Sequence, residues 1–174
     1  TAGRDAGRRF LGDPWSDRLK DNVVGLEAGF ERAVDLLEQG HTAEAARAFE
    51  RLNESYPGDV RTMCNLGIAR ARLRDFTGDM SILDAALPYD ANSGLVHVNR
   101  AACLLAMDRK GEALVAAEEA VRLAPDVAQA HFVHGGVLLA VGERAAGVEA
   151  IRTAARLDPN DAAIAAQARA LENP

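Results

Sequence analysis

Apolar residues recur at intervals of three and four along most of the chain, which predicts amphipathic helices. Residues 127–140 and 143–156 both show this spacing. Gly142 separates the two stretches, as glycine commonly does just past a helix end. Pro159 closes the second stretch, because the residue before a proline is pushed out of the α region. Helices of this length are marginal in water, so each pair is expected to stack on its neighbours.

The predicted helical pair recurs with a period of 34 residues. Pro125 and Pro159 are one period apart, Pro57 lies two periods before Pro125, and Ala91 occupies the intermediate position. Two more columns keep the same phase: Gly67, Ala101 and Gly135, and Leu52, Ala86, Ala120 and Ala154. A fixed period of this size indicates an array of helical repeats.

These columns resemble those of the tetratricopeptide repeat family over roughly residues 26–161. The matching residues are Ala33, Leu36, Ala45, Phe49 and Pro57, then Ala101, Leu104, Ala113, Ala120 and Pro125, then Gly135, Leu138, Gly147, Ala154 and Pro159. The resemblance implies an all-α fold, a right-handed superhelix of helical hairpins (an α-α solenoid) with a C-terminal capping helix. It also implies a role in protein–protein interaction.

We expect a flexible tail over residues 1–13 and a single domain over 14–174. Its repeats are predicted at 26–59, 60–93, 94–127 and 128–161, with a capping helix over 161–172 that begins after Asp161. Asp13-Pro14 is a good helix start, and Trp15, Leu19, Val23, Leu26 and Phe30 follow on one helical face. The sequence leaves open whether that helix continues to Gln39.

Residues 60–93 form the degenerate repeat. Asp79 stands where the family has a small apolar residue, opposite Gly67. A buried unpaired carboxylate costs several kcal/mol, so we expect the second helix of this pair to start late or tilt, and Pro88 to end it early. Two interpretations stay open: a drifted repeat held by its neighbours, or a loosened repeat that a partner orders.

Composition narrows the classes of partner. The chain has 174 residues and a net charge of −6, which disfavours nucleic-acid binding. It has no apolar run of the roughly 18 residues that membrane insertion needs. Cys64 and Cys103 are predicted to be small buried residues, which favours a cytoplasmic location. A periplasmic location is the alternative if a signal upstream of Thr1 has been removed, because Arg8-Arg9 lacks the apolar region of an export signal.

Motifs of catalysis are missing from the sequence, which contains no nucleophile elbow, P-loop, GxGxxG or HExxH. We therefore predict a protein that is not an enzyme and takes no cofactor. His97, His131 and His134 could gather around a metal. The family places large packing residues at 97 and 131, so we interpret these histidines as structural and predict no metal site.

The resemblance implies a concave binding wall made by the first helix of each pair. The residues carried over to this wall are Arg61, Cys64, Asn65, Ile68, Arg72, Leu95, Val98, Asn99, Ala102, Leu105, Gln129, Phe132, Gly136 and Leu139. The cations with which chaperone adaptors of the family grip a C-terminal carboxylate are replaced at Cys64, Gln129 and Val133. The wall is mostly apolar and suits an amphipathic helix or an extended apolar peptide.

The function expected from the resemblance is that of a scaffold or adaptor that binds a peptide or helix of another protein. One alternative is a homo-oligomeric assembly module, in which the N-terminal helix or a second subunit covers the groove. Another is the regulatory region of a larger enzyme.

Overall fold

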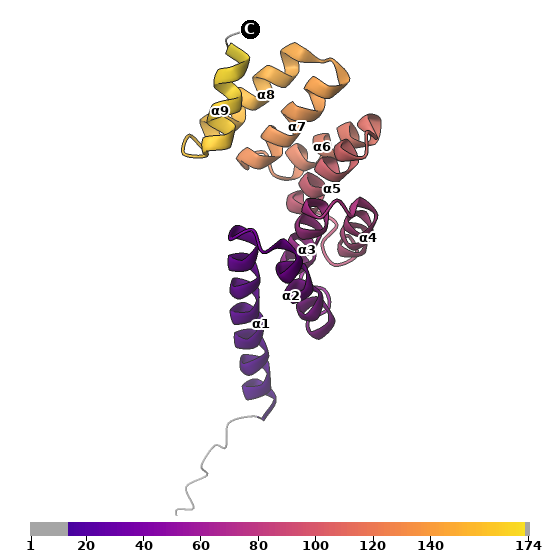
Figure 1. Cartoon of the computed structure of the whole chain (residues 1–174), viewed down its shortest axis with the longest axis vertical. Helices are drawn as coiled ribbons and strands as arrows, with labels where there is room; N and C mark the ends of the chain where they lie inside the picture. Colours follow the sequence, from indigo (N-terminus) through magenta and orange to yellow (C-terminus); the bar gives the residue numbers. More distant parts are fainter. Residues whose placement is uncertain (1–13, 173–174) are drawn as a thin grey trace, which may run out of the picture.

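Helices follow one another through residues 14–172, the part of the chain that the computed structural model describes (Figure 1). They are α1 Pro14–Glu38, α2 Thr42–Ser55, α3 Val60–Arg72, α4 Phe76–Ala86, α5 Gly94–Ala106, α6 Lys110–Leu123, α7 Ala128–Val141, α8 Arg144–Leu157 and α9 Ala162–Glu172. Within these residues there is no strand. The helices pair into hairpins that stack into a right-handed superhelix, which confirms the predicted all-α solenoid. The predicted tail, residues 1–13, lies outside the described residues.

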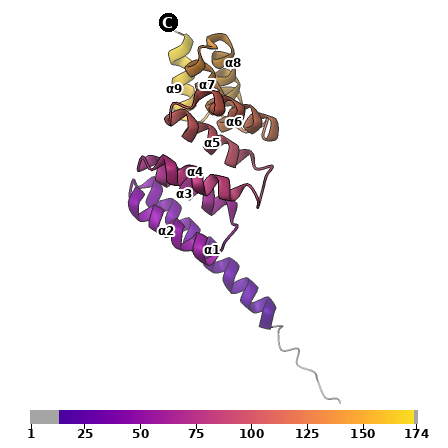
Figure 2. The same ribbon diagram turned by 90° about the vertical axis from the view of Figure 1, so that its right-hand side faces the viewer.

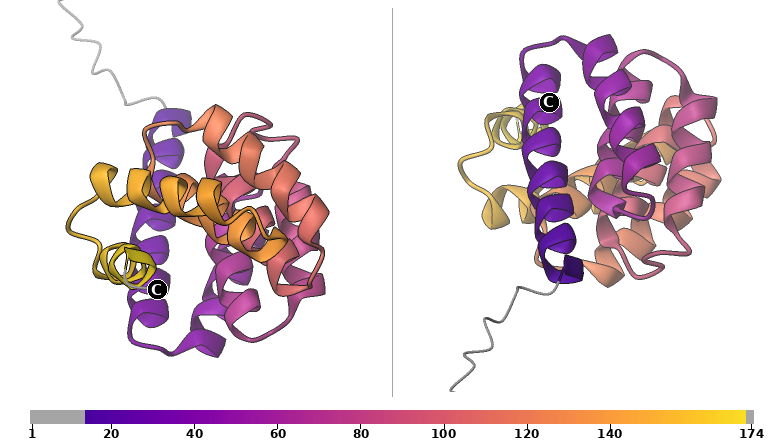
Figure 3. Two further views of the ribbon diagram at one scale, coloured as in Figure 1. Left: turned by 90° about the horizontal axis from the view of Figure 1, so that it is seen from above. Right: turned by 90° about the horizontal axis from the view of Figure 1, so that it is seen from below.

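The turn inside each hairpin keeps the 34-residue period. Gly40, Arg74, Asp108 and Gly142 all have positive φ angles, of 83°, 63°, 58° and 94°. Only glycine adopts this conformation freely, since a side chain clashes with the following carbonyl. Four hairpins therefore turn in the same way, two of them at residues that carry a side chain. Figure 2 shows the hairpins one above another, and Figure 3 shows them rotated about the long axis.

Small residues sit where the two helices of a hairpin cross. Ala33 and Ala45 are fully buried, as are Ala101 and Ala113. In the last hairpin both positions are glycine, and a Cβ atom added at Gly135 would lie 2.9 Å from the carbonyl oxygen of Gly147. Small side chains let helix backbones approach closely, which explains why these columns keep their phase.

Helix α4 differs from its equivalents at one end only. It begins at Phe76, one period from the first residues of α2 and α6, so the expected late start is wrong. Asp75 caps it by accepting a hydrogen bond from the Gly78 amide (3.0 Å). The crossing tolerates Asp79 because Gly67 has no Cβ, and one added there would lie 2.6 Å from Asp79 Oδ1. The helix ends at Ala86, which confirms the early end before Pro88.

The two ends of the array also differ. Helix α1 is continuous over 25 residues, whereas α3 has 13. The first turns of α1 project beyond the stack (Figure 2). Val23 and Val24 of α1 are 58% and 67% exposed. At the other end, Asp161 accepts hydrogen bonds from the amides of Ala163 (2.8 Å) and Ile164 (3.0 Å), which confirms it as the N-cap of α9.

Candidate protein-binding groove

Two hollows adjoin on the face formed by the first helices of the hairpins. The polar hollow, of about 340 Å³, lies between α3, α4 and α5 and is lined by Ile68, Ala71, Arg72, Phe76, Asp79, Asn99, Ala102, Cys103 and Ala106. The apolar hollow, of about 330 Å³, is lined by Ala102, Leu105, Ala106, Phe132, Val133, Gly136, Ile151 and Gln167. Both are bounded by Ala102 and Ala106 of α5, so they lie side by side, and we refer to the two together as the groove.

Small residues keep the groove open. Ala102 and Ala106 are one helical turn apart on α5, and residues four apart lie on one face of a helix. On the neighbouring α7, a Cβ atom added at Gly136 would have no neighbour within 4 Å. Phe132, one turn before Gly136, is half-buried and lines the same hollow. The apolar hollow thus has room for a side chain from outside the chain.

About half of the residues predicted for the binding wall line this groove. Those in the polar hollow are Ile68, Arg72, Asn99 and Ala102, and those in the apolar hollow are Ala102, Leu105, Phe132 and Gly136. Cys64 and Val98 are instead buried, with exposed fractions of 0% and 4%. They contribute to the packing of the hairpins and leave no surface for a partner.

The other predicted wall residues lie away from both hollows. Arg61 pairs with Glu27 (2.7 Å) and lies over the Phe30 ring, and the side chain of Asn65 donates to the carbonyl of Arg61 (2.9 Å). Leu95 is 44% exposed outside the groove. Gln129 lines a separate hollow near the turns, with Asp158 and Asp161 among its neighbours, and Leu139 packs against Gly147.

Asp79 is the unusual group of the polar hollow. Its side chain is 2% exposed, and among the described residues its Oδ1 atom has no hydrogen-bond partner. Burial raises the pKa of this carboxyl from 3.8 to about 6. Burial and the neighbouring Asp79 raise the pKa of the Cys103 thiol to about 12. Burial therefore outweighs the stabilisation that the carboxylate gains from Cys103 and Arg70.

The cations near Asp79 are held by other groups. Arg70 pairs with Glu50 (3.0 Å) and donates to the carbonyl of Gly78 (3.1 Å), while Arg72 donates to the carbonyl of Leu37 (3.0 Å). The side-chain nitrogen of Asn99 is buried and has no partner among the described residues. The polar hollow thus contains two buried polar atoms without a hydrogen-bond partner among the described residues, Oδ1 of Asp79 and Nδ2 of Asn99.

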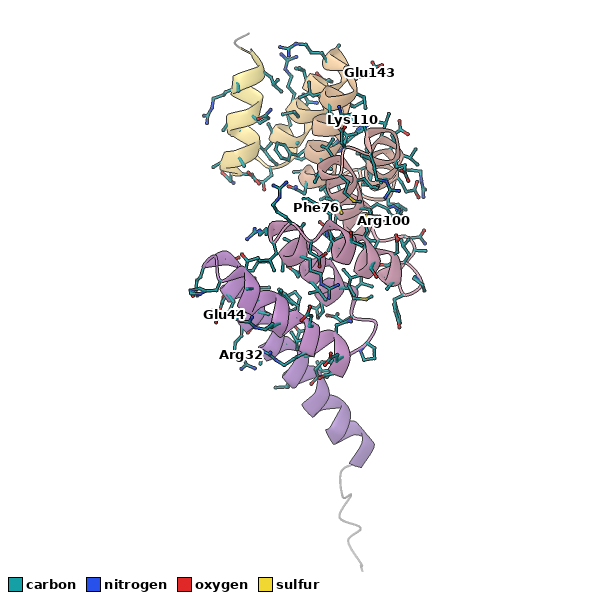
Figure 4. The ribbon with its side chains drawn as sticks, turned by 45° about the vertical axis from the view of Figure 1, so that its right-hand side comes forward. Arg32, Glu44, Phe76, Arg100, Lys110 and Glu143 are labelled. Atoms are coloured by element: carbon teal, nitrogen blue, oxygen red, sulfur yellow. The ribbon has the colours of Figure 1, made fainter. Side chains whose placement is uncertain are left out.

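Sequence reasoning missed that Asp79, Phe76 and Cys103 line the groove. It connected Asp79 with helix packing and with a loosened repeat that a partner orders, and did not place its side chain in the binding wall. Phe76 lies where α4 meets α5 (Figure 4), and its carbonyl is 3.5 Å from the sulfur of Cys103. The usable signal was the spacing of Asn99 and Cys103, which places both on one face of a helix.

Another face carries a larger hollow, of about 750 Å³, along α4, α5 and α6. Its rim is charged, but Arg100 pairs with Asp84 (3.0 Å) and Arg109 pairs with Glu112 (2.7 Å). This outer hollow therefore presents charges that are already neutralised, which makes it a suitable control surface for the groove.

The histidines of α7 have different surroundings. His131 Nε2 lies 2.8 Å from the Pro125 carbonyl oxygen, and burial lowers the pKa of His134. No group of three histidine, cysteine or acidic side chains within residues 14–172 is placed to hold a metal ion. None of the described helices combines the length and apolar character needed to span a bilayer.

A row of antiparallel helical hairpins with a 34-residue period defines the class of α-α solenoids. Within that class, residues 30–94 match the family model described as tetratricopeptide repeat. The predicted resemblance to the tetratricopeptide repeat family is therefore confirmed for residues 30–94.

Two curated proteins are similar in sequence. Anaphase-promoting complex subunit 3 of Schizosaccharomyces pombe is 26% identical over 119 residues, which are 68% of this chain and 18% of that protein. The protein STIP1 homolog of Dictyostelium discoideum is 26% identical over 97 residues, which are 56% of this chain and 17% of that protein. The chain thus spans less than a fifth of the length of either relative.

Solved structures share the fold. PilF of Pseudomonas aeruginosa has a TM-score of 0.74 at 20% identity, covering 87% of this chain and 69% of that one. MamA from residue 41 onward of Desulfovibrio magneticus RS-1 has a TM-score of 0.64 at 23% identity, with 84% and 83% covered. YrrB, described as a TPR protein with an unusual peptide-binding site, has a TM-score of 0.61 at 19% identity, with 83% and 74% covered.

Proposed function

We propose that this chain is a non-catalytic protein-interaction module that binds an apolar segment of another protein in the groove. The observation that carries this proposal is that the two hollows lie side by side and share Ala102 and Ala106 as their common boundary. A groove of this kind holds consecutive side chains of one bound segment, whereas isolated hollows hold single groups.

The energetic case rests on apolar area. Phe132, Leu105 and Val133 line a hollow that only Gln167 supplies with a polar side chain. Burying apolar surface contributes roughly 25 cal/mol per Å², and exposed apolar patches commonly mark contact sites. The peptide-binding site of YrrB supports the same use of the fold. Location in the cytoplasm stays a prediction.

Filling the apolar hollow with a side chain of the protein's own tests the proposal. Gly136→Leu adds a side chain where a Cβ meets no neighbour, so the helix keeps its packing and gains propensity. Gly111→Leu is the matched control, because a Cβ at Gly111 also meets nothing and this residue lines the outer hollow.

The measurement is fluorescence anisotropy with peptides selected from a random library on the wild-type chain. We expect these peptides to bind the Gly111→Leu variant as they bind the wild type. We expect Gly136→Leu to weaken them at least tenfold while its melting temperature stays equal or rises. Equal binding to Gly136→Leu and the wild type contradicts groove binding.

A second candidate function, self-assembly, is favoured by the projection of α1. Val23 and Val24 of α1 are exposed, and the first turns of α1 extend past the hairpin stack. Light scattering of the wild type and of the Val23→Ser/Val24→Ser double variant separates the two functions. Assembly predicts an oligomer that the double variant dissolves, whereas the adaptor function predicts the same monomer mass for both.

A further inference from the structure

The groove contains a single carboxylate, that of Asp79, among the residues that line its two hollows. Its Oδ1 atom lies at the crossing of α3 and α4, beside Gly67, and within the described residues the thiol of Cys103, a weak donor, is the side chain placed to hydrogen-bond this carboxylate. Leaving a buried acceptor without a donor is costly, more so when it is charged. A donor supplied by a partner would therefore gain more here than at a solvated carboxylate.

The chain does not neutralise this carboxylate itself. Arg70 and Arg72 of the facing helix α3 donate to Glu50 and to carbonyl oxygens instead. Arg72 and Asn99 also line the hollow, but the Arg72 guanidinium donates to the carbonyl of Leu37; the rest of the wall is apolar or small, as Ile68 and Phe76 show. A hollow with an apolar wall and one acidic group suits a side chain with an apolar stem and a cationic end.

Building on the proposed function, we propose that the polar hollow binds a lysine or arginine side chain of the partner, with Asp79 as its acceptor. The adjoining apolar hollow then takes a large apolar side chain of the same segment. Asn99 lines the same hollow.

The partner segment that fits both hollows is a basic amphipathic helix. A helix satisfies its own backbone hydrogen bonds, which an extended peptide over the apolar hollow would leave without partners. Side chains three or four positions apart lie on one helical face, so one turn can supply both the cation and the apolar anchor. The net charge of the chain, −6, also favours a basic partner.

The test is a selection of random peptides in parallel on three proteins: the wild type, Asp79→Asn and Asp84→Asn. Asp79→Asn removes the charge and keeps the size of the side chain. Asp84→Asn is the matched control, because it removes the same charge from the same helix but lines the outer hollow. Melting curves of all three confirm that the proteins are folded, and Asp79→Ala serves as a second variant.

We expect selection on the wild type and on Asp84→Asn to enrich lysine or arginine at one position, three or four residues from a large apolar residue. Selection on either Asp79 variant should lose that preference and keep the apolar residue. In the best wild-type peptide, replacing the basic residue by norleucine should weaken binding to the wild type about tenfold, and to Asp79→Asn less than twofold.

Failure of this inference is distinguishable from failure of the proposed function. If the selected peptides are weakened by Gly136→Leu but show no basic preference, or keep it on Asp79→Asn, the role of Asp79 is wrong and groove binding stands. If no selected peptide is sensitive to Gly136→Leu, both proposals are overturned.

Discussion

The hairpins α3/α4 and α7/α8 cross at equivalent positions, but different residues fill the space between the two helices. In α7/α8 the crossing residues are Gly135 and Gly147, and backbone and Ile151 fill the space directly. In α3/α4 one crossing residue is also a glycine, Gly67, but the other is Asp79. The carboxylate of Asp79 occupies the space beside Gly67. The 34-residue period determines where the helices meet. The side chains at each crossing determine whether the neighbouring surface of the groove is apolar or polar.

The difference has a functional side. A glycine pair leaves no polar group at the crossing, so the groove beside α7 is apolar. The Asp79 crossing places a buried carboxylate in the wall of the hollow beside α4. We infer that a packing imperfection of one repeat supplies the polar part of the groove, at the expense of some stability of that repeat.

The largest effect expected is at the glycine crossing. Gly135→Ala should lower the free energy of unfolding by about 3 kcal/mol, because its Cβ would lie 2.5 Å from Ile151 Cγ1 and 2.9 Å from a backbone oxygen. The adjacent Gly136→Ala is the control and should be neutral or stabilising by up to about 1 kcal/mol. Urea unfolding measures both, and equal effects of the two variants would show that the crossing is looser than described.

The Asp79 crossing should respond in the opposite direction. Asp79→Ala removes a buried carboxylate and should raise the free energy of unfolding by about 2 kcal/mol. Gly67→Ala should destabilise the wild type, since its Cβ would lie 2.6 Å from Asp79 Oδ1. It should cost at least about 1 kcal/mol less in the Asp79→Ala background, which a double-mutant cycle in urea measures. Additive effects of the two substitutions would show that Asp79 and Gly67 do not interact, which would contradict the prediction.

The same carboxyl should make the stability depend on pH. Its pKa is about 6 in the folded chain against an ordinary 3.8, so the folded state binds the proton more tightly than the unfolded state. Stability from this group is therefore gained as the pH falls through 6. Between pH 7 and pH 5 the wild type should gain about 1 kcal/mol relative to Asp79→Asn, measured by urea unfolding. A wild type that loses stability relative to this variant would contradict the burial of the carboxylate.

The smallest effect expected is at the hairpin turns. Arg74→Gly should stabilise the chain by about 0.5–1 kcal/mol, because Arg74 has a φ of 63° where two equivalent turns have glycine. Asp108→Gly should gain less, since aspartate tolerates this conformation better. Differential scanning calorimetry of the two variants checks the order, and a lower melting temperature for Arg74→Gly would show that the contact of its guanidinium with the Phe76 ring outweighs the strain.

The fold could be predicted from the sequence because the 34-residue period appears at positions where only a small residue lets the two helices approach, such as Ala101 and Gly135. The start of α4 did not follow, because the cost of burying Asp79 was considered without the space that the missing Cβ of Gly67 provides for its carboxylate. The groove was half predicted: helical phase places Ile68 and Phe132 on one face. It does not show that α5 and its neighbours cover Val98 and Cys64, which depends on how the hairpins rotate along the stack.

The most direct test of the groove is amide chemical-shift mapping of the wild-type chain with a peptide selected on it. The account predicts shifts concentrated on α5 and α7, at Ala102, Ala106 and Gly136, with little change around Val115 on the outer face. Shifts centred on Val115, or on the exposed Val23 and Val24 of α1, would contradict it.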